Sequence, residues 1–579
     1  MKLSRMAKIM GALGVLLVAG VVASVAVLKS IDLNDFKTDI EALAKKATGR
    51  NVTIAGNLDL TMSLAPSLNM NDVTVGNAAW ASDEPMMVLK SLKANVDLLS
   101  LLSGKVNVDY FVIDGLSLVF ETDGKGLANW EFERQAETAD LGQTAGGLSI
   151  TPIVRDVRLN NIDLTYIDGA TKARFHVKLA RVNANAATYD SPMTLDIKAA
   201  YNGVDFDVNS KLGSLKHLIG SGGGAFPVNL NITANGIDLK IDGGVDQPRA
   251  GMKVDVRVTA DVSNMAALNK LSGTDLSVLK SIKAAVRVQG RGAEYTFSDL
   301  NLVTAGSDLS GDIAVDLSQA RPKFTATLKS KVLDVDGLKG GEASPSTPSL
   351  TVFNTDPISL LGMKMVDFDV SFQADKVLLK PLHITTVNVQ AKLQDGLMKI
   401  RGLKMKLGGG EVAGTITVNG SKKIPAVSID LNLRGIDAGH LAADFGAGDL
   451  ATLKLKGKVA LASVGTSTRA LASRLNGSVR LAGENGRINA GVVQGLGAIE
   501  IRCFVGQLPI KNGDVVAKTV ILDSPDFEAR VTGNIDLPGE RFHLTVVPHA
   551  KTTSLASFAV PVRLKGALNA PRIGFDAGE

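Results

Sequence analysis

The sequence predicts a mainly β protein: an N-terminal transmembrane helix, then an elongated, curved antiparallel β-sheet shaped like a groove or trough, with a few short α-helices. Three observations predict it. A long uncharged apolar run stands near the N-terminus, apolar and polar residues alternate along most of the remaining chain, and helical patterns are few. A sheet with one dry face and few helices to cover it must roll up, stack on another sheet or stay open for an apolar ligand.

Composition excludes several classes of protein. The chain has 579 residues, of which 45% are hydrophobic and 21% charged, so it can fold and is not generally disordered. A net charge of +5 is too weak for a nucleic-acid footprint. Cys503 is the single cysteine, which excludes an internal disulfide and a multi-thiolate metal site. Because it stands in an apolar stretch, we expect a buried, inert thiol.

The first thirty or so residues predict a membrane anchor. Lys2, Arg5 and Lys8 precede an uncharged apolar run at residues 9–28, which as a helix spans about 30 Å, one membrane crossing. The positive-inside rule keeps residues 1–8 in the cytoplasm and sends everything after Lys29 across the membrane. A cleaved signal peptide is the rival interpretation, because Ser24 and Ala26 form a small-residue cleavage pattern.

After the anchor, apolar spacing predicts one short amphipathic helix at residues 31–48 and then strands. From Val52 onward the apolar residues alternate, and the pattern recurs to Leu564. Further helices are predicted at residues 265–282, 438–450 and 469–475. Hairpin turns, which require positive φ, are predicted at Asp114-Gly115, Asn235-Gly236, Asp395-Gly396 and Asn512-Gly513.

Composition also suggests how the exported part divides. Residues 339–357 are rich in glycine and proline and are the predicted linker. The predicted β regions are then 29–150, 151–338 and 358–579. About thirty strands in one ribbon, spaced by roughly 4.8 Å, would reach on the order of 140 Å.

Catalytic patterns are missing from the sequence. No two of the six histidines have the i, i+4 spacing of a helical metal site, and neither a phosphate-binding loop nor a nucleophile elbow is present. Carboxylates alternate with apolar positions, as on the wet face of a sheet. We therefore expect no enzyme activity, no catalytic or metal site and no cofactor.

An ordered set of short motifs is similar to one known family. After the anchor and short helix come TGRNVTIAGNL (48–58), VTVGN (73–77) with Trp80, LLSLLSG (98–104) and GLANW (126–130), and the C-terminal half adds residues 477–481, 485–487, 533–538, 560–566 and 570–572. This set resembles the AsmA family. The resemblance implies an inner-membrane-anchored periplasmic protein of a Gram-negative bacterium, without catalytic residues, linked to outer-membrane biogenesis and phospholipid transport.

The resemblance and the uncovered dry face lead to one functional hypothesis. Acyl chains would bind in a hydrophobic β-groove, and the protein would assist phospholipid transport between the inner and outer membranes. The alternative is a non-transporting periplasmic scaffold or regulator of outer-membrane protein assembly. Expected partners are phospholipid, the inner membrane and the outer membrane or its assembly proteins, not nucleic acid. The candidate groove residues are Val106, Val108, Leu116, Leu118, Phe120, Val366, Phe368 and Val370.

Overall fold

The computed structural model describes most of the chain that follows the predicted anchor. The described residues are 32–61, 67–96, 108–131, 156–218, 224–246, 253–339, 352–360, 362–445, 451–489, 498–551 and 561–575. The predicted transmembrane helix at residues 9–28 lies outside them. Within these ranges, no helix combines the length and apolar character needed to cross a bilayer.

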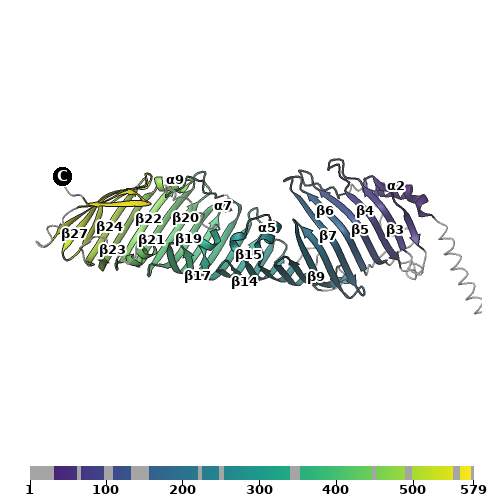
Figure 1. The fold of residues 1–579 in the computed structure, drawn as a ribbon, viewed down its shortest axis with the longest axis horizontal. Coiled ribbons are helices and arrows are strands. Elements are labelled where there is room, and N and C mark those ends of the chain that lie inside the picture. The colour runs from purple at the N-terminus through teal and green to yellow at the C-terminus, as the bar shows by residue number, and fades with distance from the viewer. Residues whose placement is uncertain are drawn as a thin grey trace, which may run out of the picture. The chain divides into compact units, whose positions relative to one another are not determined.

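The chain divides into two units, the first being residues 1–252 and 260–274. In Figure 1, α2 and β3 to β9 of this unit carry the purple to blue colours, and the strands lie side by side. Its 3-10 helix η1 spans Leu33–Phe36 and its helices are α2 (Lys37–Thr48), α4 (Leu215–Leu218) and α5 (Met265–Ser272). Its strands are β1 (Val52–Ile54), β2 (Leu58–Thr61), β3 (Ser67–Val75), β4 (Met87–Val96), β5 (Val108–Glu121), β6 (Asp156–Ile167), β7 (Arg174–Ala186), β8 (Pro192–Tyr201), β9 (Val204–Ser214), β10 (Phe226–Ala234) and β11 (Ile237–Asp246).

The second unit comprises residues 253–259 and 275–579, so β12 (Lys253–Val262) is shared between the two. Its 3-10 helix is η2 (Ser277–Leu279), and its helices are α6 (Val335–Lys339), α7 (Gly362–Met365), α8 (Ala438–Asp444) and α9 (Thr468–Ser473). Its remaining strands are β13 (Ile282–Arg291), β14 (Glu294–Thr304), β15 (Ser307–Asp316), β16 (Lys323–Asp334), β17 (Asp367–Leu379), β18 (Leu382–Gln394), β19 (Leu397–Leu407), β20 (Gly410–Asn419), β21 (Ala426–Asp437), β22 (Lys454–Val464), β23 (Asn476–Asn489), β24 (Ala498–Lys511), β25 (Asp514–Val516), β26 (Thr519–Asp523), β27 (Phe527–Asp536), β28 (Arg541–Ala550), β29 (Val562–Ala567) and β30 (Ala570–Phe575).

The mainly β prediction is confirmed, and the predicted antiparallel sheet is corrected to a mixed one. Most neighbouring strands are antiparallel, whereas β5 pairs with β6 and β16 pairs with β17 in parallel. A tight turn can only join antiparallel strands, and each parallel pair is instead joined by a long connection, residues 122–155 and 335–366. The predicted linker at 339–357 falls in the second connection, and its role as a domain boundary stays a prediction.

Three of the four predicted hairpin turns are confirmed, at Asn235-Gly236, Asp395-Gly396 and Asn512-Gly513. The fourth was wrong, because Asp114-Gly115 lies inside β5. Gly115 has a φ of 68° and is skipped between the pairs that Ser91 and Leu89 make with β5. Lys90 stands opposite it and the register is the same on both sides, so the positive φ serves a local irregularity inside the strand rather than a turn.

Helix α2 covers the first edge of the sheet, as the amphipathic pattern at residues 31–48 predicts. Ile40 packs on the core formed by Ile54, Val73 and Leu89. Two polar side chains also reach the edge strands: the Ile54 N–H donates to Glu41 Oε1 at 2.6 Å and the Leu58 N–H to Asn34 Oδ1 at 3.0 Å. These bonds satisfy backbone donors that an edge strand would otherwise offer to another chain.

Replacing Glu41 should therefore loosen this edge. We expect Glu41→Ala to cost about 1.5–3 kcal/mol locally, because a charged acceptor is removed from a backbone donor. Hydrogen exchange at the Ile54 amide should accelerate by at least about tenfold. Thr38→Ala, at an exposed position of the same helix, is the matched control, and equal exchange in the two variants would contradict the edge-cap role.

A second set of polar contacts, here called the clasp, joins residues 352–360 to α9 and to the turn between β27 and β28. Glu540, which is 7% exposed, accepts the N–H groups of Val352 at 2.7 Å and Phe353 at 3.1 Å and pairs with Arg469 at 2.9 Å. The Asn354 N–H donates to Thr468 Oγ1 at 2.8 Å. The Val352 N–H, followed by that of Phe353 and by Arg469, lowers the pKa of Glu540 despite its partial burial.

This clasp should open in acid. A carboxyl whose pKa is lowered by folding stabilises the clasp fully above its unfolded pKa, near 4.5, and loses that effect as pH falls through the lower folded value. We expect Glu540→Gln to raise amide exchange at Val352 and Phe353 at neutral pH and to remove its acid dependence. Glu528→Gln, at another carboxylate of this region, should leave both amides unchanged; equal effects of the two changes would contradict the clasp.

The remaining predicted helices form but are shorter than their patterns. Residues 265–282 yield α5 and η2, residues 438–450 yield α8, and residues 469–475 yield most of α9. Gly273 ends α5 with a left-handed φ of 68°, which is a common helix stop.

In the second unit α6 follows β16, where Val335 packs with Leu333 on the cluster of Ala374, Val377 and Ile384.

Candidate functional site

The main feature of the first unit is a line of apolar residues that crosses every strand from β1 to β11 except β2. Each member lies opposite the next in the pairing register. We call it the first-unit row: Ile54, Val73, Leu89, Leu116, Ile162, Leu179, Ala199, Phe206, Ala234 and Ile237. Parallel rows flank it, among them Met87, Leu118, Leu164 and Val177. Together they make one face of the sheet continuously apolar.

The second unit repeats the arrangement over a longer stretch. A row runs through β13 to β25 and on to β27 and β28, again with each residue opposite the next. Glycine interrupts it once. The second-unit row consists of Val288, Phe297, Ile313, Ala326, Val370, Ala391, Ile400, Ile416, Ile429, Leu461, Gly477, Ile510, Val515, Ile535 and Phe542.

Glycines indicate which way the second-unit sheet bends. A Cβ at Gly414 would lie 2.0 Å from the carbonyl oxygen of Asp430 on the next strand. Gly414 is paired with Leu403 and Leu431, so the missing Cβ is on the apolar face. Neighbouring backbone therefore rises toward that face, which makes the apolar face concave at these points. The same close approach to a neighbouring carbonyl occurs at Gly311, Gly457, Gly477 and Gly533.

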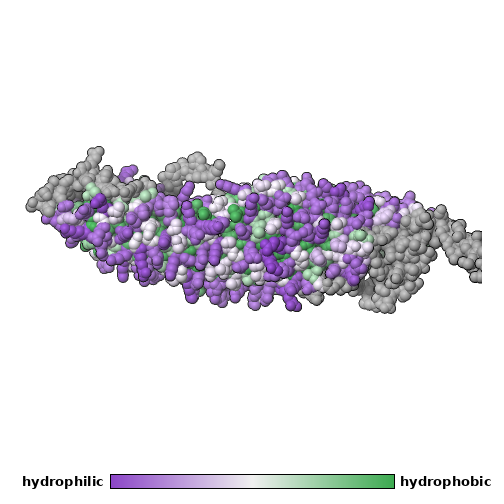
Figure 2. All heavy atoms as spheres, turned by 90° about the horizontal axis from the view of Figure 1, so that it is seen from below, coloured by the Kyte–Doolittle hydropathy of each residue, from purple (hydrophilic) through white to green (hydrophobic). Residues whose placement is uncertain are grey.

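The described helices cover these rows only in part. Ile40 of α2 packs on Ile54, Val73 and Leu89, and Ala267 and Leu271 of α5 pack with Phe206, Ala234 and Ile237 at the other end of the first-unit row. The members from Ile400 to Leu461 are half-buried, and β13, β22 and β26 have at most one buried position each. In Figure 2, seen from below, hydrophilic residues dominate the surface and hydrophobic residues show between them. Wholly buried large side chains are few within the described ranges, Ile501 and Val412 being the main ones. The apolar face of the second unit is thus shielded mainly by its own curvature and side chains.

The candidate residues predicted from sequence have different positions. Val106 lies outside the described residues, and Val108 begins β5 without a described side chain. Leu116 belongs to the first-unit row and packs on the α2 core. Phe368 lies between Phe324 and Leu393 in register, on the face of Val370. The others, Leu118, Phe120 and Val366, are half-buried.

Sequence reasoning missed how the irregularity at Gly115 in β5 shifts the alternation. Ile113 and Leu116 both pack on the α2 core, although a regular strand would place them on opposite faces. A similar irregularity lies in β24, where Ile501 pairs with Gly486 and Cys503 with Glu484. Cys503 is consequently half-buried beside Glu484 and Asp523 and not in an apolar core, so the expected buried thiol was wrong.

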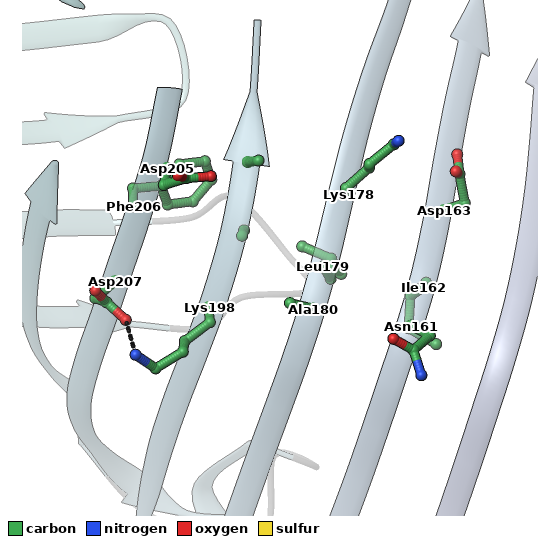
Figure 3. A pocket seen from close by; sticks show the side chains of 12 residues that line it. Asn161, Ile162, Asp163, Lys178, Leu179, Ala180, Lys198, Asp205, Phe206 and Asp207 are labelled. Atoms are coloured by element: carbon green, nitrogen blue, oxygen red, sulfur yellow. Dashed lines mark ion pairs between the residues drawn. The ribbon is translucent and has the colours of Figure 1, made fainter. Parts of the chain in front are cut away.

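A hollow of about 600 Å³ lies on β6 to β9 of the first unit. Figure 3 shows Lys198 and Asp207 pointing toward one another from β8 and β9, at 3.2 Å. Asp163, Asp205 and Lys178 also line it. Three carboxylates face two ammonium groups, so the hollow has no strong charge to select a charged ligand. Across the described part of the chain, no cluster of three residues suited to a metal ion occurs.

Several separate sequence motifs meet in a buried polar network at the end of β5. Asn129, with no exposed surface, receives the Glu121 N–H on Oδ1 at 3.0 Å and donates from Nδ2 to Asn77 Oδ1 at 2.9 Å. The Glu121 carboxylate accepts the Asn77 amide at 2.8 Å and also binds Ser82. Arg50 donates to the Asn129 carbonyl at 3.0 Å. Residues far apart in sequence thus hold one loop against one strand end.

Comparison with known proteins gives the same family as the motifs do. The model of the AsmA family matches residues 3–275 and 209–516, which together cover most of the chain. The chain belongs to the AsmA family. This AsmA-family chain is 20% identical over 646 aligned positions to the AsmA family protein YhjG of Escherichia coli (strain K12), covering 100% of the chain and 93% of that relative. It is 23% identical over 252 positions to Protein AsmA of the same organism, covering 39% and 40%. No solved structure matches it.

Proposed function

We propose that this AsmA-family protein binds acyl chains on the concave apolar face and assists phospholipid transport between the inner and outer membranes. It would be anchored through residues 9–28, with a cytoplasmic N-terminus and the bulk in the periplasm, and would support outer-membrane biogenesis. The role is binding and not catalysis. The observation that carries the proposal is the second-unit row, an unbroken apolar line save for one glycine, left without a covering layer in the described structure.

The energetics suit a lipid outside a bilayer. Burial of a methylene is worth about 0.8 kcal/mol, so a typical acyl chain gains roughly 10 kcal/mol gross against this face. From β13 to β28 the row spans about 65 Å at roughly 4.8 Å per step, longer than one acyl chain. Aliphatic residues at nearly every step give similar binding energy at successive positions, which permits sliding instead of trapping.

One alternative to lipid transport predicts different experimental results. A non-transporting scaffold or regulator of outer-membrane protein assembly would use the same sheet as a packed core and would hold no lipid. The low aromatic content of 4% and the half-buried members of the second-unit row favour a groove. In the scaffold alternative, edge strands would bind the partner proteins by strand addition.

Photo-cross-linking in living cells separates the two. The full-length chain would carry benzoylphenylalanine at Phe368, on the apolar face, or at Asp369, the exposed neighbour on the other face. We expect phospholipid adducts by mass spectrometry at position 368 and not at 369. A stable protein that yields no lipid adduct at position 368, or equal adducts at both positions, would contradict the proposal; protein adducts alone would favour the scaffold.

A further inference from the structure

The apolar rows of the first unit end in aromatic residues. Phe120, Tyr166 and Phe175 lie opposite one another on β5, β6 and β7. Trp130 meets Phe120 edge to face with ring centroids 5.2 Å apart, and Tyr166 stacks on Phe175 at 6.1 Å. Trp130 and Phe175 are 39% and 44% exposed. We call these four residues the aromatic rim, and they concentrate large rings in a chain with few of them.

Polarity changes in a fixed order along these strands. The row of Leu116, Ile162 and Leu179 and the next row, which contains Leu118, are aliphatic, and the aromatic rim follows. Beyond it come two adjacent turns, joined by the Gly169 N–H donating to Thr122 Oγ1 at 3.0 Å. A lipid leaflet has this order too: hydrocarbon, then an interface that Trp and Tyr prefer, then charged headgroups.

The two turns expose two ammonium groups, each in the same turn as one carboxylate. Asp123 accepts the Lys125 and Leu127 N–H groups, both at 2.8 Å, and Asp168 accepts the Thr171 N–H at 2.7 Å. These carboxylates are thus engaged with their own turns. Lys125 and Lys172 are exposed, and neither forms an ion pair within the part of the chain that the structure describes. Their ammonium groups complement a lipid phosphate.

The aromatic rim is also held in place before any ligand binds. The Asn129 N–H donates to the Glu121 carbonyl at 2.9 Å and its Nδ2 to the Val119 carbonyl at 2.8 Å. Trp130 follows directly in the chain. A fixed ring loses little conformational freedom on binding, which favours recognition over mere exposure.

We propose that the aromatic rim positions the glycerol and ester region of a glycerophospholipid, with its acyl chains on the aliphatic rows and its phosphate near Lys125 and Lys172. The inference rests on the proposed function, because it assigns an orientation to the lipid that the apolar face binds. It gives Trp130 a binding role beyond packing.

Tryptophan fluorescence tests this directly, because Trp80 and Trp130 are the only tryptophans of the chain. The full-length protein would be reconstituted in vesicles of phosphatidylethanolamine and phosphatidylglycerol containing phosphatidylcholine brominated near the ester end or near the methyl end of its chains. Trp80→Phe leaves Trp130 as the reporter, and Trp130→Phe leaves Trp80. We expect the ester-end bromine to quench Trp130 at least about twofold more than the methyl-end bromine.

Lysine variants and the quenching of Trp80 provide the controls for this experiment. Lys125→Gln combined with Lys172→Gln should reduce Trp130 quenching about threefold, whereas Lys178→Gln, at the hollow on β6 to β9, should not. If Trp80 were quenched as strongly as Trp130, this end of the protein would lie in the bilayer, and the inference would be overturned. The inference would also be overturned if Trp130 were not quenched, or were quenched more by the methyl-end bromine, while position 368 still captured phospholipid. If both the quenching and the capture at position 368 were lost, the proposed function itself would be overturned.

Discussion

Ile429→Asp should abolish lipid binding by the second unit while leaving the protein folded. Ile429 is half-buried in the second-unit row, between Ile416 and Leu461. Without lipid the new carboxylate can be hydrated, so its cost to folding is small. With an acyl chain against it, the charge is placed in hydrocarbon, which costs about 2.5–3.5 kcal/mol. Local occupancy should therefore fall by roughly 100-fold.

The neighbouring position supplies the matched control. Ser428 is exposed on the opposite face and pairs with Thr417 and Ala462. Ser428→Asp adds the same charge one residue away and should keep both lipid binding and growth support. Lipid adducts at position 368 and rescue of a deletion strain would be measured for both variants, with circular dichroism to check folding. Normal lipid adducts in a folded Ile429→Asp protein would sink the groove hypothesis.

Gly414→Ala should strongly destabilise the second unit. The new Cβ would lie 2.0 Å from the Asp430 oxygen and 2.9 Å from the Leu431 Cα. These are backbone atoms in a paired strand, so relief requires β20 and β21 to separate. Overpacking of this kind costs about 1–3 kcal/mol, and more when backbone must move. We expect a lower urea midpoint and faster amide exchange in β20 and β21.

Gly362→Ala is the control for this change. Apart from its chain neighbours and the backbone of its own helix, no described atom lies within 4 Å of a Cβ at Gly362, so the added methyl should alter stability by less than about 0.5 kcal/mol. The comparison isolates the close strand approach from the general effect of removing glycine. Equal stability of the two variants would show that the apolar face does not bend as sharply at Gly414 as described.

The alternating pattern predicted the sheet well because its cause is local. Successive side chains in a strand point to opposite faces, so a stretch such as Val427, Ile429 and Leu431 reveals both the strand and its dry face. The turns at Asn235-Gly236 and Asn512-Gly513 were equally readable, since few residues accept positive φ. Helix α2 followed from its apolar stripe. These features need no knowledge of distant parts of the chain.

Pairing and irregularity were not readable from the sequence. Gly115 could lie in a turn or inside a strand, and only the pairing of β5 with Leu89 and Ser91 of β4 decides for the strand. The parallel pairs β5–β6 and β16–β17 depend on where long connections return the chain. Likewise Asn129 and Asn77 are 52 residues apart, and nothing local predicts their hydrogen bond.

The sequence by itself determined that this protein is built of strands with one apolar face, and its motifs placed it in a family. The tertiary structure alone decided that those faces align into rows across the strands, that the glycines bend the second-unit sheet toward its apolar side, and that the rows of the first unit end at Trp130. The physical reason is that burial patterns are local, whereas register, curvature and the meeting of distant loops depend on which strands pair.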